Sequence, residues 1–448
     1  MGKPARITAA LGLLAAVLAA CQGLDFRLLP GTAAAPTSTA PAPTLIAPPT
    51  PTPLVVGAEE TGEPALTVLT IWMAEALSPS AETPGGQQLL EQLAAFEEGN
   101  PDIRVEVYPK LATGPGSTLA YLRSAPTVAP GVLPDLALLD REALFQAARE
   151  NLIVPMDGLV DPAILDNLYP AALLLGAVGE QLVGVPYVLQ VQHLAYREAI
   201  FEDPPNSFEA ILDSPVSYIF PAGTASNVNQ TILAQYIAAG GSLTGPDGTP
   251  LLDAAALTEV LEFYASARER GVIDPSLFQI TDLDESWEQY LSRQAGLAAV
   301  TSTAYLAERA AVRGTGVTWL PTPDGQPFAL ATGWLWVVTT SNPTRQAAAM
   351  ALFNFLMNPV NQGTLTQAAG WLPSQPGALA VWGDADRYAN FGDLLLRSAV
   401  PVPEPGIRGT VGVAIQEALE DVLIGGVPPQ QAAADAALRV NPPELGEP

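Results

Sequence analysis

"LTVLTIW" at residues 66–72, "GGQQLLEQLAAFEEGNPDI" at 85–103 and "IRVEVY" at 103–108 together decide the fold. The first run is short, apolar and β-rich, which is typical of a buried strand. The second places three of its apolar residues on one helical face and ends in a glycine and a proline. The third alternates like a half-buried strand. This order predicts a βαβ unit.

The alternation of strand and helix continues along the chain. "LPDLALLD" at 133–140 reads as a strand, and "REALFQAAREN" after it reads as a helix. Further helices are predicted at 255–271 and 343–358, the second opening with a proline at its first position. Strands separated by helices predict an α/β fold with mostly parallel sheets that are covered on both faces.

Composition limits the size and partners of this α/β body. Residues 66–440 are too many for one ordinary domain and suit two lobes. The chain has 19 Lys and Arg against 46 Asp and Glu, a net charge of −27, so nucleic acid and anionic membrane surfaces would be repelled.

The only cysteine, Cys21, follows a basic start and an apolar run. Residues 1–20 have the organisation of a secretory signal, too short to span a bilayer. The sequence "LAAC" at 18–21 resembles the bacterial lipobox, in which the cysteine sulfur is acylated after cleavage. Residues 21–65 are rich in Pro, Thr and Ala and are predicted to be a stalk. The alternatives are a free core cysteine and a proline-rich arm packed on the body.

The sequence lacks the residues that most classes of enzyme need for catalysis. There is one histidine, His193, and no G-x-S-x-G motif, P-loop or G-x-G-x-x-G motif. Nitrogen and sulfur ligands are too few for a metal site, and "TDLDESWEQ" at 281–289 has Trp287 where a calcium loop needs glycine. We expect no enzyme activity, no cofactor and no metal. A glycosidase with two carboxylates is the enzyme alternative.

A series of motifs carries a family resemblance. The chain resembles the extracellular solute-binding proteins of the maltose-binding type, which serve ABC importers, and the resemblance covers most of residues 66–440. The motifs, in order, are "LTIWMAEA", "LLEQLAAFEEGNPDIRVEVYP", "LPDLALLD", "ENLIVPMDGLVD", "EQLVGVPYVLQVQHLAYREAIFE", "AAGGSLTGPDGTPLLD", "GVTWLPTPDGQP" and "NPTRQAAAMALFNFLMNPVNQGTLTQAAGWLPS".

The resemblance implies a two-lobed periplasmic-binding-protein-like fold of type II, with a ligand cleft between lobes joined by crossover strands. The segment at 184–196 would cross from the first lobe to the second, and Pro186 within it is expected on an edge or a bulge. Lobe one would comprise residues 66–187 and 324–358. Lobe two would comprise 188–323 and 359–448.

Candidate ligand contacts follow the strands, because the crevice of an open α/β sheet lies beyond the carboxyl ends of its strands. Aromatic rings pack on the C–H faces of sugars, and carboxylates or amides accept and donate to their hydroxyls. Trp72, Glu75, Asp140 and Trp334 lie where strand runs end. Tyr187 and Gln190 lie on the segment at 184–196, and Trp371 lies in the "AAGWLPS" turn at 368–374.

The resemblance adds two further residues. Segments 301–308 and 405–415 match segments that border the cleft in similar proteins, which assigns Tyr305 and Arg408 to the ligand site. An aromatic residue is often found in the second segment, and its replacement by Arg408 argues against maltodextrin. His193 is expected to be a packing and hydrogen-bonding residue. Trp287, Trp319 and Trp382 are expected to lie in the core or on the surface.

These inferences predict a monomeric lipoprotein on the outer face of a membrane. It would close around a small solute, a mono- or oligosaccharide, and deliver it to ABC transporter permease subunits. The alternative function is that of a surface interaction or sensor-partner protein on the same fold, with a degenerate cleft.

Overall fold

The computed structural model describes residues 66–441, apart from 81, 129 and 224–228. The predicted signal segment (1–20), the stalk (21–65) and the lipidation site Cys21 lie outside these residues. Among the described helices, none combines the length and the apolar character that spanning a membrane requires.

The predicted βαβ unit is confirmed. Strand β1 (Thr67–Ala74), helix α1 (Pro84–Gly99) and strand β2 (Ile103–Lys110) follow one another, and the two strands pair in parallel along their whole length. Thr83 caps the start of the helix, because its hydroxyl accepts a hydrogen bond from the amide of Gly86 at 3.1 Å. A proline at the first helical position completes this start signal.

The strands form one ten-stranded mixed sheet with the order β2-β1-β3-β10-β6-β8-β7, while β9 and β11 also pair with β6 and β12 pairs with β10. The prediction of mostly parallel sheets is therefore wrong for the centre. There, β6 and β10 are antiparallel to each other, and each is antiparallel to further neighbours. The remaining strands are β3 (Leu136–Asp140), β6 (Val185–Arg197), β7 (Tyr218–Ile219), β8 (Leu297–Thr301), β9 (Thr315–Thr318), β10 (Ala329–Val338), β11 (Leu372–Pro373) and β12 (Ala399–Pro401), and a separate pair is formed by β4 (Ala177–Val178) and β5 (Gln181–Leu182).

Strand β6 is the crossover predicted at 184–196. Its first part pairs with β10 and β11, and its second part pairs with β8 and β9. The β6–β10 register shifts by one residue next to Pro186, whose partner is Leu335. The expected bulge is therefore present, and it accommodates a residue that lacks an N–H group.

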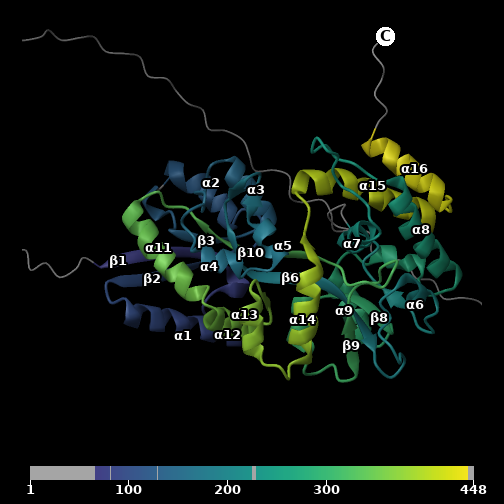
Figure 1. Cartoon of the computed structure of the whole chain (residues 1–448), viewed down its shortest axis with the longest axis horizontal. Coiled ribbons are helices and arrows are strands. Elements are labelled where there is room, and N and C mark those ends of the chain that lie inside the picture. Colours follow the sequence, from purple (N-terminus) through teal and green to yellow (C-terminus); the bar gives the residue numbers. More distant parts are fainter. Residues whose placement is uncertain (1–65, 81, 129, 224–228, 442–448) are drawn as a thin grey trace, which may run out of the picture. The chain divides into compact units, whose positions relative to one another are not determined.

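Helices cover both faces of the sheet (Figure 1). The predicted helices after residues 140, 254 and 342 are present as α3 (Arg141–Arg149), α8 (Ala254–Glu269) and α11 (Pro343–Leu356). The others are α2 (Thr118–Val128), α4 (Pro162–Asp166), α5 (Pro170–Leu175), α6 (Phe208–Leu212), α7 (Gln230–Ala238), α9 (Leu283–Leu291), α10 (Ser302–Glu308), α12 (Pro359–Ala369), α13 (Pro376–Leu379), α14 (Arg387–Ser398), α15 (Pro405–Leu423) and α16 (Pro429–Val440).

The buried apolar side chains separate into two large clusters. The first contains side chains from β1, β3 and the first half of β6, together with α1 and α11. The second contains Leu194 from the second half of β6 and side chains from α7, α8, α15 and α16. A small third cluster around Trp287 and Tyr290 lies under α9. Each large cluster is the core of one lobe, and β6 passes from one to the other.

The predicted lobe division and the core clusters differ at residues 359–402. The sequence placed this segment in lobe two, but its buried side chains from Leu365 to Val402 pack in the first cluster. Helix α12 lies against α1, where the Gln92 amide donates to the carbonyl of Asn361 at 2.7 Å. No local pattern in 359–402 encodes this partner, which is almost 270 residues away.

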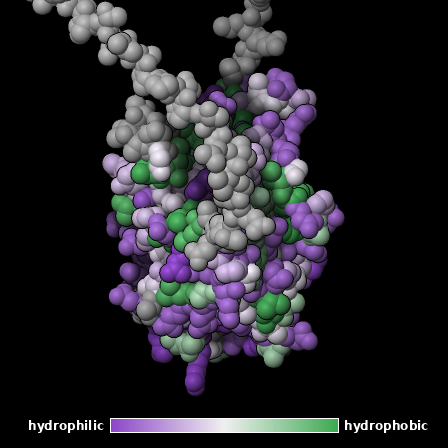
Figure 2. Space-filling view, turned by 90° about the vertical axis from the view of Figure 1, so that its left-hand side faces the viewer, coloured by the Kyte–Doolittle hydropathy of each residue, from purple (hydrophilic) through white to green (hydrophobic). Residues whose placement is uncertain are grey.

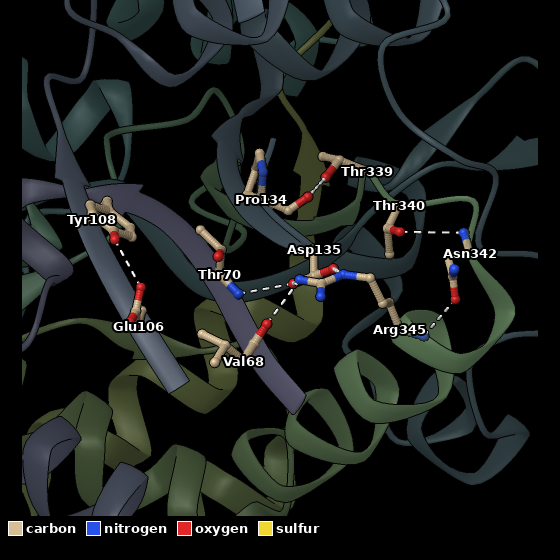
Figure 3. A network of polar contacts seen from close by, with 10 residues as sticks. All are labelled: Val68, Thr70, Glu106, Tyr108, Pro134, Asp135, Thr339, Thr340, Asn342 and Arg345. Atoms are coloured by element: carbon tan, nitrogen blue, oxygen red, sulfur yellow. Dashed lines mark hydrogen bonds and ion pairs between the residues drawn. The ribbon is translucent and has the colours of Figure 1, made fainter. Parts of the chain in front are cut away.

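A polar network ties α11 to the sheet of the first lobe (Figure 3). The buried carboxylate of Asp135 accepts from the amide of Thr70 and from the guanidinium of Arg345, which also donates to the carbonyl of Val68. Beside it, the Thr339 hydroxyl donates to the carbonyl of Pro134. On the face of the body that Figure 2 shows, hydrophobic residues form separate patches among hydrophilic ones.

Candidate ligand-binding site

A row of six half-buried side chains crosses the centre of the sheet. It consists of three neighbouring cross-strand pairs, in which Asp140 pairs with Trp334, Gln190 with Thr332 and Gln192 with Thr301. We call these six residues the polar row. Cross-strand partners share one face of a sheet, so the row forms a continuous strip along β3, β10, β6 and β8.

Alternation along the strands produces this strip. On β6 the two glutamines alternate with Leu189, Val191 and His193, all of which are buried. On β10 the threonine and tryptophan of the row alternate with the buried residues Ala331 and Leu335 and with Gly333. The polar row is therefore the partly open face of an otherwise buried crossover.

The first cavity on this row has a volume of about 240 Å³. Hydroxyl and amide groups dominate its walls, and Asp282 is the one charged residue among the described lining residues. Gln190 donates to the Thr303 hydroxyl at 2.6 Å, and the Gln192 oxygen accepts from Thr231 at 3.0 Å. These bonds orient the amides while leaving donor and acceptor capacity for a polar ligand.

A second cavity, of about 200 Å³, shares Thr332 with the first and continues to Asp140. Across it, the guanidinium of Arg408 on α15 lies 3.1 Å from the carboxylate of Glu142 on α3. The Asp140 side chain accepts from the amide of Ala143 at 2.7 Å and so caps α3.

Burial controls the charges in this second cavity. It raises the pKa of Asp140, although the backbone amide of Ala143 opposes the shift. Burial lowers the pKa of Arg141 to about 10, and its guanidinium donates to the carbonyl of Leu175 at 2.5 Å. Arg141 stays charged at neutral pH and the Glu142–Arg408 ion pair lies beside it, so this end of the cleft is ionic and the first cavity is mainly neutral.

Comparison with known proteins identifies the family. A family model of bacterial extracellular solute-binding proteins matches residues 91–390. The chain belongs to this family. Its members are binding proteins rather than enzymes, and the family's extracellular character implies a location outside the cytoplasm. A search of curated proteins finds no match to this solute-binding protein.

Solved structures support the fold of this solute-binding protein. It is similar to the cyclic alpha-maltosyl-1,6-maltose binding protein of Arthrobacter globiformis, with a TM-score of 0.70 and 18% identity over 84% of this chain and 98% of the other. It is also similar to the sugar-binding protein MalE of Xanthomonas citri, with a TM-score of 0.67 and 20% identity over 84% of this chain and 96% of the other. A third similar structure is maltose-bound MalE3 of T. maritima, with a TM-score of 0.63 and 18% identity over 84% of this chain and 99% of the other. At these identities the likeness establishes the fold, which agrees with the predicted periplasmic-binding-protein-like class.

The structure of this solute-binding protein brings four predicted site residues together. Asp140, Gln190 and Trp334 belong to the polar row, and Arg408 lines the second cavity. Trp371 is half-buried and precedes Leu372, whose partner on β6 is Leu189. Continuing that register by one residue sets Trp371 beside Gln190, at the edge of the row.

Trp72 and Glu75 lie apart from the row. Trp72 is only 4% exposed, because the Lys110 ammonium lies 4.9 Å from its ring centre and Tyr121 packs edge-on against it at 5.9 Å. Glu75 is exposed in the turn after β1 and lines none of the cavities described above. In this structure Trp72 is therefore a core residue of lobe one rather than a cleft residue.

Tyr187 and Tyr305 also differ from the prediction. Tyr187 is completely buried against Trp336, with 5.2 Å between ring centres, because it lies at the β6 bulge and points into the first core. Tyr305 stacks on Tyr388 at 5.0 Å and contacts His193, which alternates with the row and faces the opposite side of β6. The prediction that His193 packs and hydrogen-bonds is confirmed: it is buried, 3.1 Å from the Tyr388 hydroxyl.

Sequence reasoning missed Thr332, Thr301, Thr231 and Asp282, all of which line the first cavity. The alternation of Thr332 and Trp334 with small or apolar residues could have revealed the first of them. Asp282 belongs to the stretch that mimics a calcium loop, but its carboxylate accepts from the amide of Glu285 and caps α9. Within the described residues, no group of three or more metal-ligating side chains occurs.

Proposed function

We propose that this protein is the lipid-anchored receptor of an ABC importer and that it captures a mono- or oligosaccharide on the polar row. The observation that carries the proposal is the row itself: three adjacent cross-strand pairs that combine one indole ring, one carboxylate, two amides and two hydroxyls at the crossing between two cores. Such a set offers stacking and hydrogen bonding to one polyhydroxylated ligand.

The charge of the site argues against an anionic ligand. The described walls of the first cavity contain no cationic side chain, and at the other end Arg408 is paired with Glu142. An anionic solute would find no free partner in the first cavity and would approach a protein with a net charge of −27. A neutral sugar meets neither obstacle.

The mechanism that we propose is closure about the crossover strands. Only a ligand that contacts both lobes shifts an equilibrium between open and closed forms. The row lies where β6 leaves the first core for the second, so a ligand on it meets Asp140 from one side and the walls formed by α7 and α9 from the other. Few residues at the ends of elements need to change conformation for such a motion.

The test is a thermal-shift screen of the purified full-length chain against mono- and oligosaccharides, amino acids and polyamines. A ligand at 100 times its Kd stabilises the folded state by about 2.7 kcal/mol, which moves Tm by a few degrees. We expect a shift with a sugar and none with lysine or spermidine. A folded sample that responds to no compound would favour the alternative, a surface interaction protein with a degenerate cleft.

Anchoring is tested separately. We propose that Cys21 carries the lipid that holds the body at the membrane, which implies incorporation of an alkyne-labelled fatty acid in cells. The variant Cys21→Ser should lose the label and appear in the soluble fraction. Equal labelling of both forms would contradict the assignment.

A further inference from the structure

The ion pair between Glu142 and Arg408 connects the two lobes. Glu142 lies in the first turn of α3, a helix that buries Leu144 and Ala147 in the first core. Arg408 lies in the first turns of α15, which buries Val411 and Ile415 in the second core. Figure 1 shows α3 and α15 as separate helices. The Arg408 guanidinium on α15 lies 3.1 Å from the Glu142 carboxylate on α3.

The surroundings of Arg408 favour a defined position for its guanidinium. The side chain is only 19% exposed, and its Nη2 lies 3.1 Å from Glu142 Oε2. The same cavity is lined by Asp140 and the buried Arg141, so one opposite and one like charge at the start of α3 lie near Arg408. Moving α15 away from α3 would separate Arg408 from its partner and from Asp140 together.

We propose that the Glu142–Arg408 pair is a latch between the lobes: before any ligand arrives it stabilises the arrangement in which α3 and α15 approach each other, which we call the closed form. The inference rests on the proposed closure of two lobes and adds its regulation. The latch raises the fraction of molecules that are ready to hold a ligand. Because the apparent affinity of a protein is reduced when only part of its molecules are in the binding-competent state, a larger fraction gives tighter binding.

The exposure of the ion pair limits how strongly it can favour the closed form. Glu142 is 56% exposed, and ion pairs with such exposure contribute little, so the closed-to-open ratio should change about two- to fivefold when the pair is removed. The contribution should fall with ionic strength, because exposed charges are screened over a Debye length of about 8 to 10 Å in ordinary buffers.

The experiment measures the distance between the lobes without ligand. The full-length chain with Cys21→Ser receives labels at Thr113→Cys, an exposed position in the loop before α2, and at Ala434→Cys, an exposed position on α16. Single-molecule energy transfer then gives the populations of the closed and open forms. Glu142→Gln and Arg408→Gln should each lower the closed-to-open ratio about two- to fivefold, and the double variant should not lower it further.

A matched control lies at the other end of α3. Glu150 pairs with Arg123 at 2.5 Å with 41% exposure, but both residues belong to elements of the first lobe. Glu150→Gln should leave the populations unchanged, and 0.5 M NaCl should act on the wild type as Glu142→Gln does. The latch is refuted if Glu142→Gln behaves like Glu150→Gln while the wild type still exchanges.

The outcomes separate the latch from the proposed function. A wild type that shows no exchange at all removes the closure on which the latch depends, whatever the sugar screen gives. A sugar-dependent thermal shift together with unchanged populations in Glu142→Gln keeps the proposed function and overturns only the latch.

Discussion

The carboxylate of Asp135 and the guanidinium of Arg345 form a two-point ion pair, with Nε 2.6 Å from Oδ1 and Nη2 2.5 Å from Oδ2. Asp135 precedes β3 and is almost completely buried, whereas Arg345 lies in the first turn of α11. The same carboxylate accepts the amide of Thr70 at 2.9 Å. One side chain thus holds two strands and a helix of lobe one together (Figure 3).

Asp135→Asn should destabilise the fold by about 2–3 kcal/mol, because hydrogen bonds to a buried charged group are lost and Arg345 keeps a charge without its partner. Arg345 is 38% exposed, so solvent screening limits the loss. Urea unfolding measures the change. The control Asp213→Asn removes an exposed pair with Arg270 and should stay within about 0.5 kcal/mol of the wild type.

The single histidine predicts a pH dependence. Burial lowers the pKa of His193 to about 4, below the value near 6.5 expected in the unfolded chain. Below about pH 6.5 the histidine is protonated in the unfolded chain but stays neutral in the folded protein until about pH 4. The free energy of unfolding therefore falls as pH decreases from about 6.5 to 4, and this residue lowers it no further below the folded pKa. From pH 7 to pH 5 the histidine should account for about 2 kcal/mol.

The variant His193→Gln isolates this contribution. It removes the titrating ring, so the slope of unfolding free energy against pH between 7 and 5 should become smaller than that of the wild type. Carboxylates titrate in both proteins and cancel in the difference. Identical slopes would show that His193 titrates alike in the folded and unfolded chain.

Trp334→Ala should weaken binding of the sugar found in the screen by about 1–3 kcal/mol, because the indole is the aromatic surface of the polar row. Isothermal titration calorimetry measures the change. Trp319→Ala is the matched control, since that indole donates to the carbonyl of Gly325 and lines neither cavity of the row. Equal affinities of the two variants would remove Trp334 from the site.

Trp72→Ala should act on folding instead. The ring is 4% exposed within the first core, and truncation of a buried tryptophan costs about 3–5 kcal/mol. Sugar affinity of the folded fraction should stay close to that of the wild type. A stable variant with weakened binding would return Trp72 to the ligand site, where the sequence first placed it.

Local patterns in the sequence were sufficient for the elements and for part of the site. The βαβ start, the helix at Pro343 and the bulge at Pro186 follow from periodicity and proline chemistry within a few residues, whereas the crossing of 184–196 between the lobes was implied by the family resemblance. Asp140 and Trp334 were found because each lies where an expected strand ends or is interrupted. Such signals are contained in the residues themselves.

Long-range packing determined what the sequence did not reveal. Lys110 and Tyr121 cover Trp72 from neighbouring elements. Tyr305 stacks on Tyr388 instead of facing the cleft, and Tyr388 also contacts His193, more than 190 residues away in the sequence. Segment 359–402 joins the first core because α12 packs on α1. Periodicity carries no information about which distant helix or ring will be the partner.

The contact between α1 and α12 gives the last prediction, which depends on Gly85. A Cβ atom at this position would lie 2.5 Å from Cβ and 2.7 Å from Cα of Ala369, so the side chain and the backbone of α12 would both have to move. Gly85→Ala should therefore destabilise the protein by about 1–3 kcal/mol, against the usual gain of about 0.5–1 kcal/mol for alanine over glycine in a helix. Gly99→Ala, at the other end of α1, meets nothing within 4 Å and should be neutral or stabilising. Urea unfolding of the two variants compares them directly, and a Gly85→Ala protein as stable as Gly99→Ala would mean that α12 does not approach α1 this closely.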